Sequence, residues 1–396
     1  MAFSKYLLPV VVVTQVVFAS RCGDFKISSQ SDADILANCS TVDGDINIDK
    51  DYSGNLYLRG ITQVRGSITC DNCSNLASLH ADSISAIGGD LQLFKAVSLT
   101  SLEFSQLTTV LGTVELVALS SLQSLGFTAG VTKAGGVHIE NTKLANLNGI
   151  SPKTISRLTI RANQFLKSAK LNSLMNVTDE AEFFDNYDGL EVELLSLSSG
   201  TNMTFHSVKD VSIPSLHRTS GSLTFSNCQF ESLSAPNLTS AGDLTFFNNT
   251  QLSNISLPVL QQVNGGFNIT NFDPLKNITL PSLEKVPGFI DFNGDFDTLR
   301  MSKLDDVYGA FRVRSTGNIE DDCSWLMLYQ NLTIRGMMQC KEESDHKTHG
   351  DVNTTSTTSG GVPSATSTSN VAAISRIHVP AVSLVAAVFY ALARLF

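Results

Sequence analysis

The chain has 396 residues, of which 42% are hydrophobic and only 16% are charged, and 27 Lys and Arg stand against 37 Asp and Glu for a net charge of −10. A nucleic-acid-binding protein is expected to have a basic surface, so this acidic balance argues against nucleic acid as a partner. A protein that crosses a membrane several times needs several apolar runs of about 20 residues. The interior of this sequence has no such run.

The N-terminal end predicts secretion. Residues 1–19 contain Lys5, then an apolar run, and finish with Val17 and Ala19 at the two positions that a signal peptidase inspects. This pattern is typical of a cleaved signal peptide. The mature chain is therefore expected to begin at residue 20 and to fold in an oxidising compartment.

The C-terminal end predicts a lipid anchor. Residues 371–396 contain a short polar spacer and then an apolar tail, which is typical of a GPI-attachment signal. Asn370 is the expected attachment residue, and Ser369 is the next choice. Residues 341–370 are rich in Ser and Thr without an apolar period, so they predict a disordered, O-glycosylated stalk.

A repeat of about 20–24 residues fills residues 20–340. Each copy begins with a small residue and an alternating strand, as in GDLQL at Gly89 and GSLTF at Gly221. Apolar residues alternate with Ser, Thr and Asn, so each strand is expected to bury one face. A second apolar stripe ends at a proline, such as Pro258 or Pro281, which cannot donate to a strand ladder. The pattern predicts an all-β fold, a parallel β-solenoid.

Leucine-rich repeats are the alternative architecture, but their coil usually adds a helix and their Asn falls at a different offset from the strand. Here an Asn recurs two residues after the second apolar position of the strand. We expect these amides to stack at equivalent turns and to bond backbone groups of neighbouring coils. The residues in question are Asn72, Asn141, Asn186, Asn227, Asn248 and Asn271. The pattern weakens between residues 150 and 200, which indicates either a seam between two halves or degenerate coils.

The cysteines agree with secretion. The candidate disulfide residues are Cys22, Cys39, Cys70, Cys73, Cys323 and Cys340. The first and the last pair bracket the repeat region, so disulfides are expected to close both of its ends. The middle pair is either a local disulfide or two separate buried thiols, because a metal site would need a second such pair. Cys228 is left over and falls at a turn of the repeat.

Asn-x-Ser/Thr sequons predict heavy N-glycosylation. The expected sites are Asn38, Asn176, Asn202, Asn237, Asn254, Asn268, Asn277, Asn331 and Asn353. Asn72 and Asn248 are sequons too, but they also belong to the predicted Asn ladder, so we expect them to be poorly glycosylated. Because sequons fall on both strands of the repeat, glycans are expected on more than one face.

The motifs resemble those of the fungal GPI-anchored cell-wall organisation proteins, a family that includes sporulation-specific wall proteins. The resemblance runs over residues 22–340 and is carried by SDADILANCSTVDGDINI, GVHIENTKLANLNGI and FESLSAPNLTSAGDLTFFNNTQLSNISLPVLQQVNGGFNITNF. The family's ectodomain is similar to the receptor L-domain. The resemblance implies a GPI-anchored protein of the outer plasma membrane and cell wall. It also implies a role in wall organisation and integrity, with cell-wall polysaccharide or wall mannoproteins as partners. It supplies no catalytic residue.

No cofactor, metal or catalytic site is expected. The histidines outside the stalk and tail, such as His138 and His206, are scattered over different coils and are interpreted as single solvent-facing residues. The oxygens of Asp291–Asp297 alternate like those of a Ca²⁺ loop, but Phe296 stands where a glycine is needed, so a polar strand and turn is the better interpretation. The chain is expected not to be an enzyme. The alternatives are a wall-glucan remodelling enzyme, which needs two carboxylates on a cleft, and an adhesin or receptor for an external ligand.

Overall fold

The computed structural model describes residues 22–271, 274–328 and 334–342. The predicted signal peptide, the stalk beyond residue 342 and the GPI signal lie outside the described residues. So do the sequons Asn331 and Asn353 and the anchor candidates Asn370 and Ser369, which stay predictions. Among the helices of the described part, none is long and apolar enough to cross a membrane.

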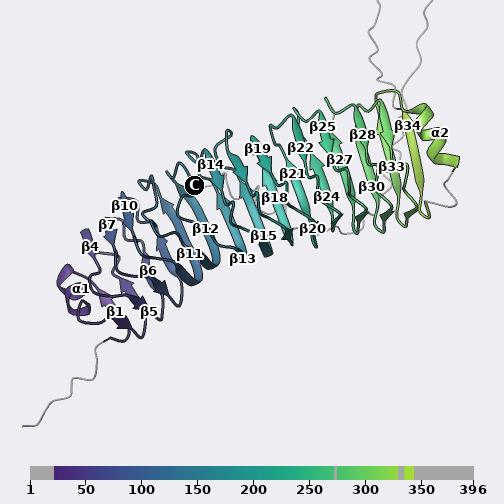
Figure 1. Ribbon diagram of the computed structural model, residues 1–396. Coiled ribbons are helices and arrows are strands. Elements are labelled where there is room, and N and C mark those ends of the chain that lie inside the picture. The colour runs from purple at the N-terminus through teal and green to yellow at the C-terminus, as the bar shows by residue number, and fades with distance from the viewer. Residues whose placement is uncertain (1–21, 272–273, 329–333, 343–396) are drawn as a thin grey trace, which may run out of the picture. The chain divides into compact units, whose positions relative to one another are not determined.

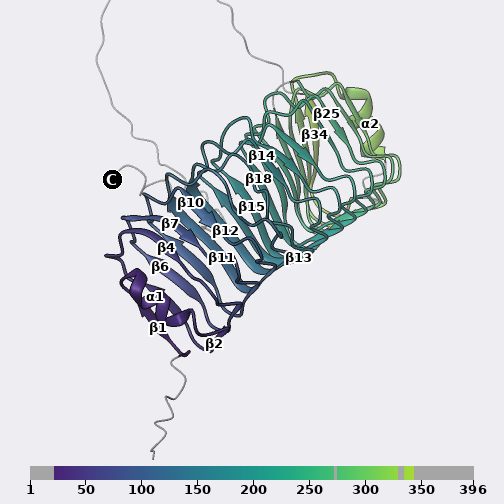
Figure 2. The ribbon, with the colours of Figure 1, turned by 60° about the vertical axis from the view of Figure 1, so that its left-hand side comes forward.

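The chain winds into coils whose strands lie parallel to the equivalent strands of the next coil, so the predicted all-β parallel solenoid is confirmed. Figures 1 and 2 show the strands stacked in chain order. The front face is made by β1 Phe25–Ile27, β3 Ile46–Ile48, β6 Ile68–Asp71, β9 Leu91–Phe94, β11 Thr109–Leu119, β12 Lys133–Thr142, β13 Thr154–Arg161, β15 Asn176–Phe184, β18 Asn202–His206, β21 Leu223–Ser226, β24 Leu244–Phe247, β27 Phe267–Asn271, β30 Ile290–Gly294, β33 Phe311–Ser315 and β34 Met338–Glu342.

Two further faces complete each coil. The side face consists of β2 Thr41–Val42, β5 Gln63–Val64, β8 Ala86–Ile87, β17 Ser199–Gly200, β20 Arg218–Thr219, β23 Ser240–Ala241, β26 Gln262–Val263, β29 Lys285–Val286 and β32 Asp306–Val307. The first residues of β11, β12, β13 and β15 also belong to this face. The back face consists of β4 Gly54–Tyr57, β7 Leu76–His80, β10 Ser101–Glu103, β14 Ser168–Lys170, β16 Glu191–Glu193, β19 Asp210–Ser212, β22 Ser232–Ser234, β25 Asn254–Ser256, β28 Asn277–Thr279 and β31 Thr298–Arg300.

The core is a set of columns, because the register places equivalent residues of successive coils side by side. Phe205 of β18 pairs with Phe225 of β21, which pairs with Phe246 of β24. The Phe205 and Phe225 ring centroids are 5.3 Å apart, as are those of Phe225 and Phe246, and all three side chains are fully buried. Ring stacking adds to the hydrophobic stabilisation of each burial. Inward apolar alternation therefore becomes one continuous core.

The front ladder continues through the segment where the sequence pattern weakens. Gly136 of β12 pairs with Arg157 of β13, Arg157 pairs with Glu180 of β15, and Glu180 pairs with Asn202 of β18. The front strands are therefore paired without a break between residues 150 and 200. Pro214 lies two residues after β19, as expected of a residue that ends the second strand of the coil.

A helix and a disulfide lie at each end of the described repeats (Figure 1). Helix α1, Gln30–Leu36, begins after Ser29, whose side chain accepts a hydrogen bond from the Asp32 backbone while the Asp32 carboxylate accepts one from Ser29 in return. Cys22 is joined to Cys39 beside this helix, and Cys323 of α2, Glu320–Leu328, is joined to Cys340 of β34. A third disulfide joins Cys70 to Cys73 locally.

A ladder of buried side chains joins successive coils, but most of the asparagines predicted to form it lie one residue before it. Asn72, Asn141, Asn227 and Asn248 have φ between 53° and 59°, the left-handed conformation that Asn tolerates at a corner. The buried ladder lies one residue later, at Thr142, Asn163, Asn186, Cys228 and Asn249. Of the predicted members only Asn186 belongs to it, and the side chain of Asn271 lies outside the description.

Cys228 takes the place of an asparagine in this ladder. Its thiol is free and buried, and it donates to the Phe205 carbonyl at 3.3 Å, while its backbone N–H donates to Oδ1 of Asn249 at 2.9 Å. Asn249 donates in turn to the Phe225 carbonyl at 3.1 Å. Cys228 therefore lies at a turn of the repeat, as the sequence indicates, and has a structural role there.

Candidate functional site

The sequons are unevenly spaced along the repeat, and the longest stretch without one lies in its N-terminal half. Between Asn72 and Asn176 the sequence contains no Asn-x-Ser/Thr triplet, so residues 73–175 are here named the sequon-free coils. Their front strands are β9, β11, β12 and β13. Beyond them, the sequons Asn202 and Asn268 lie on front strands β18 and β27.

The remaining described sequons lie on other parts of the surface. Asn254 and Asn277 are exposed at the start of back strands β25 and β28, and Asn38 is exposed after α1. The Asn237 side chain donates to the Pro214 carbonyl at 2.8 Å, and Oδ1 of Asn176 accepts a hydrogen bond from the Ser199 hydroxyl at 2.8 Å. The sequons thus lie on more than one face.

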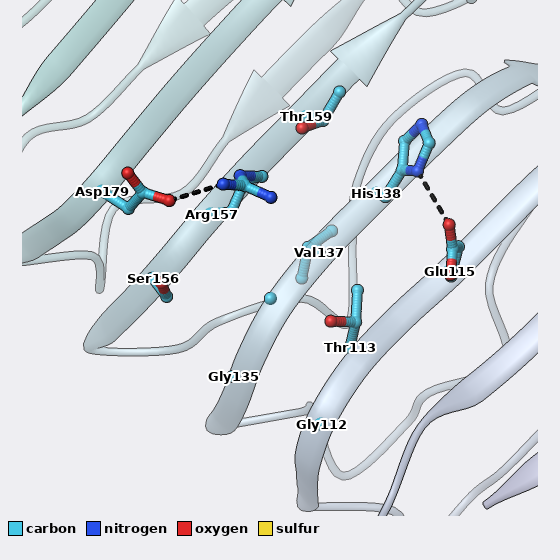
Figure 3. A pocket seen from close by; sticks show the side chains of 11 residues that line it. Gly112, Thr113, Glu115, Gly135, Val137, His138, Ser156, Arg157, Thr159 and Asp179 are labelled. Atoms are coloured by element: carbon cyan, nitrogen blue, oxygen red, sulfur yellow. Dashed lines mark hydrogen bonds and ion pairs between the residues drawn. The ribbon is translucent and has the colours of Figure 1, made fainter.

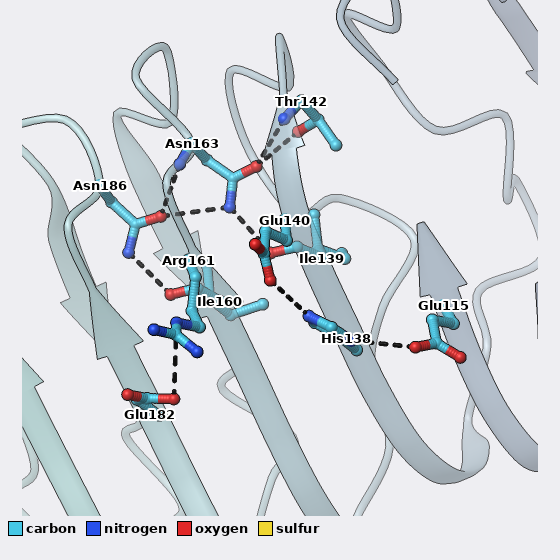
Figure 4. A network of polar contacts seen from close by, with 10 residues as sticks. All are labelled: Glu115, His138, Ile139, Glu140, Thr142, Ile160, Arg161, Asn163, Glu182 and Asn186. Carbon is cyan, nitrogen blue, oxygen red and sulfur yellow. Dashed lines mark hydrogen bonds and ion pairs between the residues drawn. The ribbon is translucent and has the colours of Figure 1, made fainter. Parts of the chain in front are cut away.

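The outward side chains of the front face change in character along the stack. Near and within the sequon-free coils they are charged and joined into a network (Figure 4). His138 of β12 contacts Glu115 of β11 through Nδ1 at 3.1 Å and Glu140 through Nε2 at 2.9 Å. One coil further on, the guanidinium of Arg161 lies 3.8 Å from the Glu182 carboxylate. From β18 to β24 the corresponding residues are Thr204, Thr224 and Thr245.

Burial alters the titration of two groups at the C-terminal border of this network. Burial raises the pKa of Glu182, and the positive charge of Arg161 partly opposes this rise. The pKa of His206 is lowered by burial, and the nearby Asp185 carboxylate opposes that shift. Both groups belong to front strands that follow the sequon-free coils.

Two half-buried aromatic side chains at this border, Phe184 and His206, stack on each other. The ring of Phe184 lies 4.3 Å from that of His206, with an interplanar angle of 19°. The guanidinium of Arg161, on the preceding coil, lies 5.4 Å from the centre of the Phe184 ring. Because both faces of Phe184 are occupied, the stack stabilises the coils and offers no stacking platform to a ligand.

A polar pocket opens on the front face of the sequon-free coils (Figure 3). Gly136 lies in register between Thr113 and Arg157, so a side chain is missing where both neighbouring coils have one. The resulting hollow, here named the glycine pocket, has a volume of about 410 Å³. It is lined by Gly112, Thr113, Glu115, Gly135, Gly136, Val137, His138, Ser156, Arg157, Thr159 and Asp179.

Two of the three glycines that line the pocket, Gly135 and Gly136, have different reasons to be glycine. A Cβ on Gly135 would come within 2.5 Å of the Leu111 carbonyl oxygen, so the close approach of the two backbones excludes any side chain. A Cβ on Gly136 would meet only the side chain of Thr113 at 2.9 Å, which can rotate, and the Arg157 carbonyl at 3.5 Å. Gly136 therefore creates space, whereas Gly135 permits the packing of the coils.

Of the residues that the sequence singled out, only His138 lines this pocket. The sequence had indicated a single solvent-facing histidine at this position. Glu115, Arg157 and Asp179 were missed. The signal that could have found them is the coil length, since Glu115 and His138 are 23 residues apart, and so are one coil apart. Arg157 and Asp179 are 22 residues apart, and Nη2 of Arg157 lies 2.7 Å from Oδ2 of Asp179.

The other candidate chemistry is accounted for by ordinary contacts. Nη2 of Arg312 lies 2.9 Å from Oδ2 of Asp291, and Asp295 pairs with Lys276, so two of the three carboxylates of the calcium-like stretch have cationic partners. His206 stacks in the column described above. Within residues 22–271, 274–328 and 334–342, no three of His, Cys, Asp and Glu are grouped so that they could hold a metal.

The structure thus defines a class: an all-β repeat protein with disulfides at both ends and a run of sequon-free coils. Residues 1–37 match the Ecm33 family, described as GPI-anchored cell wall organization protein. Residues 66–186 and 190–289 match the BspA type leucine rich repeat region in 6 copies. The repeat is therefore related to leucine-rich repeats, in agreement with the predicted receptor L-domain-like solenoid, although the coils of the described part lack the usual helix between α1 and α2.

Curated relatives agree along nearly the whole chain. Protein ecm33 of Aspergillus fumigatus is 45% identical over 365 residues, covering 91% of both chains. The cell surface GPI-anchored protein of Arthroderma benhamiae is 35% identical over 353 residues, covering 89% of this chain and 90% of the relative. Sporulation-specific protein 2 of Saccharomyces cerevisiae is 29% identical over 308 residues, covering 76% of this chain and 61% of the relative. No solved structure matches the chain.

The chain belongs to the Ecm33 family of GPI-anchored cell-wall organization proteins. The family resemblance drawn from the motifs is therefore confirmed. The expected location, GPI-anchored at the cell surface and in the cell wall, is confirmed by these relatives as well.

Proposed function

We propose that this cell-wall protein is a non-catalytic scaffold that binds a wall component, polysaccharide or mannoprotein, through the front face of its sequon-free coils. One observation carries the proposal. The longest part of the chain without sequons contains all of the glycine pocket lining except Asp179, together with the Glu115, His138 and Glu140 cluster of the charged network. A binding surface must stay free of bulky N-glycans, and these coils meet that requirement.

The test adds a glycan to this face and compares it with the same addition elsewhere. Arg157→Asn creates the sequon Asn-Leu-Thr on β13, and Ser222→Asn creates the sequon Asn-Leu-Thr just before β21, in the equivalent position of a later coil. Cells with the first variant are expected to be as sensitive to wall stress as cells that lack the protein. Cells with the second are expected to grow like the wild type.

Two controls make the comparison sound. An endoglycosidase-sensitive gel shift must show that both new sequons are glycosylated, and surface staining must show equal amounts of both proteins. Equal growth of the two strains under wall stress would contradict binding through the sequon-free coils.

The alternative of a wall-glucan remodelling enzyme needs a carboxylic acid that can donate a proton. Glu182 is its candidate, because burial raises the pKa of this residue, but Glu182 does not line the glycine pocket. Incubation of the protein with β-glucan oligosaccharides separates the classes, since a time-dependent change in chain length would establish catalysis. The third alternative, an adhesin or receptor for an external ligand, predicts that deletion impairs adhesion and leaves wall-stress resistance intact.

A further inference from the structure

We propose that the glycine pocket binds a sugar unit of a neutral wall polysaccharide. The inference rests on the proposed function and specifies the class of ligand for the same face. It starts from the shape of the pocket. The missing side chain at Gly136 leaves a hollow of about 410 Å³ between Thr113 and Arg157, within the range of sites that hold small ligands.

The lining of the pocket selects a polar ligand. Small-molecule sites are mostly lined by apolar and aromatic side chains, whereas this one is surrounded by charged and hydroxyl groups (Figure 3). Arg157 supplies N–H donors, and Glu115 and Asp179 supply carboxylate acceptors. Hydroxyls of Thr113, Ser156 and Thr159 can do either. A sugar ring carries adjacent hydroxyls that both donate and accept, so it matches such a mixed lining.

The charges of the pocket favour a neutral sugar over an anionic one. The guanidinium of Arg157 is already paired with the Asp179 carboxylate at 2.7 Å. His138 lies between the carboxylates of Glu115 and Glu140, at 3.1 and 2.9 Å. A phosphate or carboxylate on the ligand would meet these acids without an unpaired cation to balance it. Hydroxyl groups can bond to the same atoms while the ion pairs stay in place.

The surroundings of the pocket suit a chain longer than one unit. A second hollow of about 530 Å³ lies on the side face and shares Gly135 with the glycine pocket, and it is lined by Leu111, Lys133 and Lys153 among others. The two hollows meet at Gly135, so a polymer can extend from one hollow into the other over the corner of the coil. Asn176, which pairs with Thr154 of the second hollow, is the first sequon beyond it.

The test fills the hollow without altering the charges. Gly136→Thr extends the side-chain column of Thr113, at a position where φ is not in the left-handed region and where Thr113 can rotate away. Ala310→Thr is the matched control, because Ala310 precedes β33 in the equivalent outward position of a later coil. The full-length, GPI-anchored proteins are purified in detergent. Their binding to fluorescent hexamers of β-1,3-linked glucose, of β-1,4-linked N-acetylglucosamine and of mannose is measured.

The wild type and Ala310→Thr are expected to bind at least one of the three hexamers with the same affinity, and Gly136→Thr is expected to bind it at least tenfold more weakly. A second variant, Arg157→Gln, covers the case in which Gly136→Thr misfolds, because the Arg157 side chain is largely exposed and its replacement should leave the fold intact. Its affinity for the hexamer is expected to be at least fivefold lower than that of the wild type. Binding to the hexamer is expected to change less than twofold between 0.05 and 0.5 M salt, because the ligand is uncharged.

Each of the other outcomes contradicts either the sugar site in the glycine pocket, the neutral charge of the ligand, or the proposed function. If Gly136→Thr and Arg157→Gln bind as tightly as the wild type, the pocket is not the sugar site, although wall binding by another part of the face survives. If binding collapses with salt, the ligand is anionic and the inference is wrong. If the wild type binds the wall material of whole cells but none of the hexamers, the ligand is a mannoprotein and the inference is wrong. If it binds neither hexamers nor wall material, the proposed function itself fails.

Discussion

The side-chain amide of Asn163 lies next to that of Asn186, one coil further on, with 3.1 Å between Nδ2 of Asn163 and Oδ1 of Asn186 (Figure 4). The same Nδ2 donates to the Ile139 carbonyl at 2.9 Å, and Oδ1 of Asn163 accepts from the backbone and hydroxyl of Thr142 at 3.0 and 2.7 Å. Asn186 continues the ladder by donating to the Ile160 carbonyl at 2.8 Å. These buried amides hold together the corner behind the charged network.

Asn163→Ala is therefore expected to lower the free energy of unfolding by on the order of 3 kcal/mol, since it leaves the Ile139 carbonyl and the Thr142 amide buried without partners. Asn141→Gly is the control, because Asn141 is exposed and has a φ of 53°, which glycine adopts freely. Denaturant unfolding of the two variants measures the difference. An equal loss in both would show that the ladder runs through the exposed corner instead.

The solenoid fold could be predicted from the sequence, whereas the position of the ladder within each coil could not. The parallel solenoid could be predicted because the alternation and the coil length repeat many times. The ladder could not be placed, since Asn is favoured both at the left-handed corner, as at Asn141, and at the buried position that follows it, as at Asn163. A shift of one residue separates the two. The glycine pocket was missed for a related reason, because its residues come from coils that only an accurate register brings together.

The thiol of Cys228 is expected to react slowly in the folded protein. Burial raises its pKa to about 11, whereas an exposed thiol has its pKa near 8.5, and only the thiolate reacts. At pH 8 alkylation by iodoacetamide should be more than about 100-fold slower than in the denatured chain. Mass spectrometry of the modified protein measures both rates. Rapid labelling under native conditions would mean that the corner at Cys228 opens readily.

Protonation of His206 is expected to destabilise the fold. Its pKa in the folded protein is lowered by burial, so the unfolded chain binds the proton more readily, and stability is lost as the pH falls below the ordinary histidine pKa of about 6.5. His206→Phe keeps a ring against Phe184 and removes this titration. The melting temperature of the wild type should therefore fall more than that of the variant between pH 7.5 and pH 5. Parallel curves for the two proteins would assign the pH dependence to groups other than His206.

Glycans are expected on both the front and the back of the stack. Asn202 and Asn268 lie on front strands, while Asn254 and Asn277 begin back strands. Asn248 should also be occupied, because it is an exposed corner residue and not a member of the buried ladder. Glycopeptide mass spectrometry reads the occupancy of each sequon. Occupied sequons confined to one face would contradict the expectation of glycans on both faces. An unmodified Asn248 would instead support the expectation from the sequence that this residue is poorly glycosylated.

Gly135 and Gly136 of the pocket are expected to respond differently to the smallest substitution. Gly135→Ala places a methyl group within 2.5 Å of the Leu111 carbonyl, so the neighbouring coils must move apart at a cost of about 1–3 kcal/mol or more. Gly136→Ala places the same group against the mobile side chain of Thr113, and the stability should change by less than about 0.5 kcal/mol. Denaturant midpoints of both variants give the comparison. Equal destabilisation would show that Gly136 is also required by the packing of the coils, and the hollow would then be a by-product of the fold and not a space kept for a ligand.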